Sequence, residues 1–256
     1  MRFMVVIAAL AACLSASEAR ATEPVRIFMA GDSTMAEKLP EKSPETGWGE
    51  MLQDWFPADE VTVINHAMNG RSTRTFIEEG RWNALLAELR PGDFVLIQFG
   101  HNDQAKSKPE RYTPPETFKN NLTRFTSDVG DRGAQPVLIT PVARRRFDEN
   151  GEFYDSHGVY PDLVREVAGS SGTPLIDLHA RSTLFLQAYG AERSRDLFLW
   201  LHPNEHENYP GGVEDNTHFS AEGARAMASL VMQGILQNLP DLAAKVQYLP
   251  GGIQHE

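Results

Sequence analysis

The segment VRIFMAGDS, residues 25–33, is the most informative stretch for the fold, because it joins an apolar strand directly to a serine. Residues 25–29 are mostly apolar, which is typical of a strand covered on both faces. Such strands occur in parallel sheets with helices on either side. Ser33 follows the strand, at the edge where open α/β sheets bind their ligands. Serine is also a favoured helix N-cap, so this segment alone leaves a structural and a catalytic interpretation open.

Outward from this segment, four more short apolar runs alternate with amphipathic stretches. The expected strands are residues 25–29, 61–64, 94–99, 136–140 and 174–177. The expected helices are residues 48–55, 82–89, 118–129, 160–168, 178–189 and 221–236. This alternation predicts an α/β fold with a five-stranded parallel sheet covered by helices. Because no linker or repeat divides the chain, we expect a single domain over residues 22–256.

The first residues are basic and then apolar, and Ala19-Arg20-Ala21 resembles a signal-peptidase cleavage site. We therefore expect a signal peptide over residues 1–21 and a secreted or periplasmic protein without a membrane span. Leu10-Ala11-Ala12-Cys13 resembles a bacterial lipobox, and the alternative is a lipid anchor at Cys13. Cys13 is the single cysteine of the chain, so the protein has no disulfide, and after cleavage it would have no cysteine nucleophile.

The chain is acidic, with 35 Asp and Glu against 24 Lys and Arg and a formal net charge of -11. Such a charge repels the phosphate backbone and argues against nucleic acid as a partner. An acidic polymer would need a local basic patch in order to bind. We expect a monomer.

Polar or small residues follow three consecutive predicted strands: Ser33, Gly70 and Asn102. Gly70 can present a backbone N–H toward a reacting oxygen, and the uncharged amide of Asn102 can donate a hydrogen bond to a developing oxyanion. Each residue taken singly also fits an ordinary turn. Three successive strand ends of this kind form a constellation that the turn interpretation does not predict.

Asp215 and His218 stand near the end of the chain, in the stretch DNTHF. A serine hydroxyl needs a base to accept its proton, and the base works best when a carboxylate orients it. At positions i and i+3 the two side chains can meet if the turn is helical. The alternative is a helix cap with a half-buried histidine, but Ser220 to Gly223 offers the last helix a cap of its own.

Four blocks have now appeared in order: GDS with Ser33, NGRS with Gly70, GHND with Asn102, and DNTH with Asp215 and His218. They resemble the blocks of the GDSL or SGNH hydrolases, and the resemblance covers residues 25–240. Thr34 stands where many relatives have leucine, which leaves the serine untouched. GDSTM, NGRSTRTF, FGHND and HPNEHENYPGGVEDNTHF are similar to the rhamnogalacturonan acetylesterase group of that superfamily.

The resemblance implies a flavodoxin-like three-layer α/β/α fold, an extracellular pectic substrate, the release of acetyl groups and no cofactor. It also implies a catalytic triad of Ser33, His218 and Asp215. Ser33, Gly70 and Asn102 would form the oxyanion hole. Two alternatives remain: an esterase for another acylated glycan such as acetylxylan, and a carbohydrate-binding protein that has lost catalysis.

Arg71, Arg74 and Arg144 follow predicted strands and are candidates to bind uronate carboxylates, and Trp200 is a candidate to stack on a sugar ring. The alternatives are solvated arginines paired with surface acids and an aromatic used in local packing.

His202, Glu205 and His206 lie close together in sequence and raise the question of a metal. Zinc sites need a third protein ligand in a supporting shell, and this stretch lies in a predicted loop. We therefore expect no bound metal.

Overall fold

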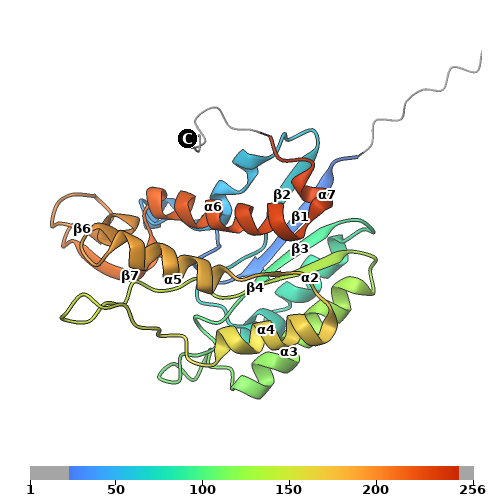
Figure 1. Cartoon of the computed structure of the whole chain (residues 1–256), viewed down its shortest axis with the longest axis horizontal. Helices are drawn as coiled ribbons and strands as arrows, with labels where there is room; N and C mark the ends of the chain where they lie inside the picture. The colour runs from blue at the N-terminus through green and yellow to red at the C-terminus, as the bar shows by residue number, and fades with distance from the viewer. Residues whose placement is uncertain (1–22, 248–256) are drawn as a thin grey trace, which may run out of the picture.

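The computed structural model describes residues 23–247. Its central sheet has five strands in the order β2-β1-β3-β4-β5 (Figure 1). The strands are β1 (Val25–Gly31), β2 (Val61–Asn65), β3 (Phe94–Gln98), β4 (Gln135–Ile139) and β5 (Leu175–Ile176). Every neighbouring pair is parallel, which confirms the predicted sheet. The strand order is that of flavodoxin-like folds.

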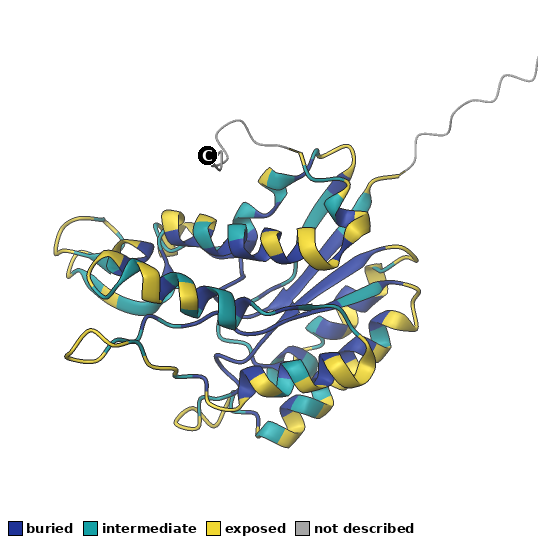
Figure 2. Cartoon of the chain, in the orientation of Figure 1, coloured by how far each residue is buried: buried dark blue, intermediate teal, exposed yellow. Residues whose placement is uncertain are grey.

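Alternate side chains of β1 enter two separate cores, because successive residues of a strand point to opposite faces. Ile27 and Met29 join one core, whereas Phe28 and Ala30 join the other. One face is covered by α5 (Leu178–Tyr189) and α6 (Ala221–Asn238). The other is covered by α1 (Thr73–Glu78), α2 (Arg81–Glu88), α3 (Pro115–Gly130) and α4 (Tyr160–Ser171). The predicted three layers are confirmed, and the buried sheet between half-exposed helices is visible in Figure 2.

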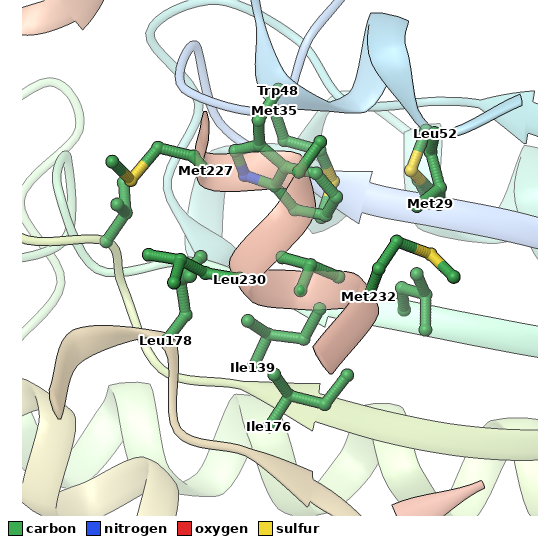
Figure 3. Packing of buried hydrophobic residues seen from close by; sticks show 14 of the residues in the cluster. Met29, Met35, Trp48, Leu52, Ile139, Ile176, Leu178, Met227, Leu230 and Met232 are labelled. Atoms are coloured by element: carbon green, nitrogen blue, oxygen red, sulfur yellow. The ribbon is translucent and has the colours of Figure 1, made fainter. Parts of the chain in front are cut away.

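Figure 3 shows part of the core on the α6 side, with α6 between Trp48 and Met35 on one side and Ile139 and Ile176 on the other. The indole of Trp48 is fully buried, and its Nε1 donates a hydrogen bond to Gln98 Oε1 at 2.8 Å. Gln98 Nε2 in turn donates to Thr34 Oγ1 at 2.7 Å. Because buried polar groups are costly without partners, this chain of bonds ties the residue after Ser33 to the middle of the sheet.

Residues 48–55 do not form the predicted helix. They form two short 3₁₀ turns, η2 (Trp48–Met51) and η3 (Gln53–Trp55). Gly49 lies against the chain that follows β1, where a Cβ atom would be 2.4 Å from the carbonyl oxygen of Met35. This close backbone approach and the low helix propensity of glycine favour turns, although Trp48 and Leu52 keep the helical spacing of buried residues.

The remaining helices confirm the predicted ones within a few residues. Ser220 caps α6, since its Oγ accepts a hydrogen bond from Gly223 N at 3.1 Å, as the sequence predicts. The sequence analysis did not predict α1, two short 3₁₀ turns, the short helix α7 or the antiparallel strand pair β6–β7. Their bounds, apart from those of α1 given above, are η1 (Pro40–Lys42), η4 (Arg193–Leu197), α7 (Pro240–Ala243), β6 (Phe198–Leu201) and β7 (Val213–Phe219).

The predicted signal peptide over residues 1–21 and the possible lipid anchor at Cys13 lie outside the described residues. Within residues 23–247, none of the helices has the length and apolar character needed to cross a membrane.

Candidate active site

The segments that follow the first three strands meet at one cavity. Ser33 follows β1, Gly70 follows β2 and Asn102 follows β3, and all three line a cavity of about 340 Å³. His218 lines the same cavity, although 185 residues separate it from Ser33. The side chains of four cations also line it: Lys42, Lys108, Arg111 and Arg144.

Two hydrogen-bond contacts connect Asp215, His218 and Ser33 in series. His218 Nδ1 lies 2.7 Å from Asp215 Oδ2, and His218 Nε2 lies 2.8 Å from Ser33 Oγ. With the proton on Nδ1, the ring donates to Asp215 and leaves Nε2 to accept from the serine hydroxyl. Burial alone would raise the pKa of Asp215, but the hydrogen bond and charge of His218 and two backbone donors lower it to about 2. Asp215 is therefore an anion at neutral pH.

Asp215 and His218 meet through an irregular strand and not through a helical turn. Regular pairing of β7 with β6 involves Val213, Glu214 and Phe219, so residues 215–218 bulge away from the ladder. Within this bulge, Asp215 Oδ1 accepts hydrogen bonds from the backbone N–H groups of Thr217 and His218, at 2.7 and 3.0 Å. The carboxylate thereby folds the chain back on itself and brings the two side chains to one side.

Arg145 holds this bulge from behind. Its backbone N–H donates to the carbonyl of Asn216, and its Nη1 donates to Asn216 Oδ1, both at 2.9 Å. The guanidinium is buried, stacks on Trp200 at 5.1 Å, and donates to Ser194 Oγ at 3.1 Å. Replacing Arg145 would remove several of these donors at once, so we infer that Arg145 stabilises the bulge that carries Asp215 and His218.

A second histidine–carboxylate pair lies beneath Ser33. Asp32 is fully buried, and its Oδ2 lies 3.1 Å from His101 Nδ1. Its Oδ1 accepts hydrogen bonds from the N–H and hydroxyl of Thr34, at 3.0 and 2.8 Å. Burial opposes the charge of Asp32, yet these partners lower its pKa overall, and burial lowers the pKa of His101. The pair anchors the turn that presents Ser33.

Lys38 connects the Ser33 turn to its neighbours. Its ammonium donates to the carbonyl of Ser33, to Asn69 Oδ1 at 2.9 Å and to Glu45 Oε1, which lies at 2.7 Å. The side chains of Lys38 and Glu45 are 3% and 9% exposed, so this is a nearly buried ion pair. The same oxygen of Glu45 lies 3.9 Å from His218 Nε2.

Sequence reasoning missed His101, Lys38, Glu45 and Arg111. For His101 a signal was present, because it stands beside Asn102 in a polar strand end. Lys38 and Glu45 are ordinary charged residues of an irregular stretch, and nothing in their spacing predicts burial beside Ser33.

Of the four predicted substrate contacts, Arg144 lines the cavity and donates to the carbonyl of His101 at 3.2 Å. The other three do not line it. Arg71 pairs with Glu79 at 2.9 Å, and Arg74 pairs with Glu78 at 3.0 Å. Trp200 donates from Nε1 to Asn216 Oδ1 at 3.1 Å, which uses its polar edge to support the bulge.

The residues of the candidate metal motif, His202, Glu205 and His206, make hydrogen bonds within a local turn. Glu205 Oε2 accepts a hydrogen bond from His202 N at 2.6 Å, and His206 Nδ1 accepts one from Asn208 N at 3.2 Å. Over residues 23–247, no group of three or more His, Cys, Asp or Glu side chains is arranged to hold a metal ion.

Comparison with known proteins identifies relatives of this chain. Residues 29–226 match the GDSL-like lipase/acylhydrolase family. The chain is 47% identical over 213 residues to rhamnogalacturonan acetylesterase RhgT of Bacillus subtilis strain 168, which covers 83% of this chain and 90% of that protein. It is 39% identical over 210 residues to the probable rhamnogalacturonan acetylesterase YesY of the same strain, covering 82% and 91% of the two chains.

Among solved structures, that of Bacillus subtilis protein YxiM superimposes with a TM-score of 0.71 at 28% identity. The superposition covers 84% of this chain and 57% of that longer chain. Fold and family together define an α/β carboxylic ester hydrolase. The chain belongs to the GDSL-like lipase/acylhydrolase family, and the predicted resemblance is confirmed.

Proposed function

We propose that this protein is a secreted, monomeric serine esterase that removes acetyl groups from pectic polysaccharide. The observation that carries the proposal is the continuous contact from Asp215 through His218 to Ser33 Oγ. The names of relatives at 47% and 39% identity support acetyl groups on rhamnogalacturonan as the substrate class. The sequence of residues 1–21 supports export.

The reaction proceeds in two steps. His218 Nε2 takes the proton of Ser33 Oγ as the oxygen attacks the acetyl carbonyl, and the charge of Asp215 stabilises the resulting imidazolium. The imidazolium then protonates the leaving sugar oxygen, which gives an acetyl-serine and a free hydroxyl on the polymer. Water, deprotonated by the same ring, cleaves the acetyl-serine and releases acetate. No cofactor takes part in this scheme.

In the proposed oxyanion hole, the backbone N–H groups of Ser33 and Gly70 and the side-chain amide of Asn102 receive the carbonyl oxygen as its charge develops. Gly70 has φ +77°, a left-handed conformation that favours glycine. Loss of one such donor costs about 100- to 1000-fold in turnover in other serine hydrolases.

A pectic substrate is supported by the charge of the cavity. Lys42, Lys108, Arg111 and Arg144 line it, and the one carboxylate among the described lining residues, Glu45, is paired with Lys38. This local excess of cations contrasts with the net charge of -11 of the whole chain. Cations of this kind suit the uronate carboxylates of pectin and have no evident partner on neutral acetylxylan.

The test is acetate release from acetylated rhamnogalacturonan, acetylxylan and p-nitrophenyl acetate, by wild type and by Ser33→Ala and His218→Ala. We expect release to be fastest on the pectic polymer and to fall by about a million-fold in both variants. Release from acetylxylan at an equal or higher rate would remove the pectic assignment and keep the triad. Activity that survives in either variant would contradict the triad itself.

A further inference from the structure

The side chain of Asn102 is held in one orientation by two partners of opposite character. Its Nδ2 donates to the carbonyl of Arg71 at 2.9 Å, and its Oδ1 accepts from Arg111 Nη1 at 3.0 Å. A guanidinium only donates and a carbonyl only accepts, so a flipped amide would lose both bonds. One N–H of the amide is thus engaged, and the second is left for the cavity that Asn102 shares with Ser33.

Arg111 lies beside two of the proposed oxyanion donors at once. Besides its bond to Asn102, its Nη1 is 3.4 Å from the position that a Cβ atom on Gly70 would occupy. Arg111 itself also lines the cavity, and its side chain is 26% exposed. Its Nε pairs with Glu110 Oε1 at 3.2 Å, while its Nη1 donates to the oxygen end of the Asn102 amide, where such a bond polarises the amide and makes its N–H a stronger donor.

The backbone around Arg111 is fixed from outside the cavity. Arg74 donates to the carbonyls of Pro109, Glu110 and Tyr112, at 3.0, 2.9 and 3.2 Å. Thr113 N donates to the carbonyl of Asp103 at 2.9 Å, which closes the loop between residues 103 and 113. Because this loop is fixed at both ends, it can hold Arg111 beside Asn102, which follows β3.

We propose that Arg111 is a positioning residue for catalysis, which locks the Asn102 amide as an oxyanion donor and raises its donor strength. The inference rests on the proposed function, since it takes Asn102 to face the oxyanion. If Arg111 has this role, it affects the chemical step for every ester, including those without a carboxylate.

The experiment measures kcat and KM for p-nitrophenyl acetate, a neutral ester that is too small to need uronate recognition. The variants are Arg111→Met, which keeps the apolar stem and removes the donors, Arg111→Lys, Asn102→Ala and the double variant Arg111→Met with Asn102→Ala. Arg124→Ala is the control, because Arg124 lies on α3 and pairs with Asp128 on the surface. Thermal unfolding of each variant checks that it is folded.

We expect Arg111→Met to lower kcat about tenfold with little change in KM, as for the loss of a hydrogen bond to a charged group. Arg111→Lys should recover part of this loss. In the double variant Arg111→Met should cost nothing beyond Asn102→Ala, because both changes act through one amide.

Two results would overturn the inference while leaving the proposed function standing. One is an unchanged kcat in Arg111→Met beside a large loss of kcat in Asn102→Ala. The other is a double variant whose fold loss in kcat equals the product of the two single losses. An unchanged kcat of Arg111→Met on p-nitrophenyl acetate beside a higher KM for acetylated rhamnogalacturonan, measured in parallel, would make Arg111 a substrate contact only. An unchanged kcat in Asn102→Ala would remove Asn102 from the oxyanion hole, and the inference would fail with it.

Discussion

The pKa values of two carboxylates, Asp215 and Asp103, are shifted in opposite directions. Asp215 meets His218 and two backbone N–H groups, and its pKa falls to about 2 despite burial. Asp103 is also buried, but its donors are the N–H and hydroxyl of Thr73, at 2.9 and 2.6 Å. Here burial prevails and raises the pKa to about 7. The partnership with His218 therefore keeps Asp215 ionised, whereas Asp103 is only partly ionised at neutral pH.

The raised pKa of Asp103 predicts a pH-dependent stability. Between about pH 4 and pH 7 the folded state keeps a proton that the unfolded chain has lost, so stability falls as pH rises through this window and levels off above it. Asp103→Asn removes the titration and keeps an acceptor for Thr73. We expect the loss of stability from pH 4.5 to pH 8, measured by urea unfolding, to be smaller in Asp103→Asn than in wild type. Parallel curves for the two proteins would show that Asp103 ionises normally in the folded state.

At the scale of elements, the site depends on where regular structure stops. The bulge of β7 brings Asp215 to His218, and the turn after β1 presents Ser33. Each irregular piece is bonded to a charged side chain from elsewhere: Arg145 for the bulge, and Lys38 for the Ser33 turn. Because irregular backbone lacks ladder partners, such side chains supply the missing hydrogen bonds.

Arg145 therefore carries a prediction about the bulge. Arg145→Met leaves Ser194 and Asn216 without charged donors and should lower the free energy of unfolding by about 1–3 kcal/mol. Loosening of the bulge should also reduce kcat for p-nitrophenyl acetate by about 10- to 100-fold. Arg193→Met is the matched control, since Arg193 stacks on Tyr189 at 4.7 Å. If Arg145→Met behaves like that control in kcat, the bulge does not need Arg145.

The start of α6 carries a second prediction at this scale. Gly223 packs so closely on the end of η4 that a Cβ atom would lie 1.7 Å from the carbonyl oxygen of Leu197. Gly223→Ala should displace the first turn of α6 and destabilise the protein by about 1–3 kcal/mol. Gly169→Ala is the control, because Gly169 in α4 has no neighbour within 4 Å of such an atom. There we expect a gain of about 0.4–1 kcal/mol from helix propensity and chain entropy, measured by thermal unfolding.

For the molecule as a whole, charge is distributed unevenly. The chain carries a net charge of -11, yet the cavity beside Ser33 is lined by four cations. If the substrate is the proposed pectic polymer, its repulsion by the net charge has to be overcome locally, within about the Debye length of 10 Å at 0.1 M salt. This arrangement makes binding of an acidic polymer dependent on a few side chains at the cavity.

Replacing Lys108, one of the four cations, tests whether polymer binding depends on the charges at the cavity. Lys108→Ala should raise KM for acetylated rhamnogalacturonan about two- to fivefold, the range for one exposed ion pair, and leave KM for p-nitrophenyl acetate unchanged. The rise should shrink at high salt because exposed charges are screened. Lys106→Ala removes an equal charge from an exposed residue nearby that does not line the cavity. Equal effects of the two variants would show that only net charge matters, and not the cavity.

The parallel sheet, most helices, the cap of α6 and the family could be predicted from the sequence, since apolar periodicity and short motifs are local properties. It placed Ser33, Gly70 and Asn102 at strand ends, and there the structure finds them. The folded chain was needed to show that Asp215 reaches His218 through a bulge, that Trp48 begins a 3₁₀ turn, and that Lys38 and Arg111 lie beside the site. These features depend on contacts between distant segments and on close backbone approach, and neither leaves a periodic pattern in the chain.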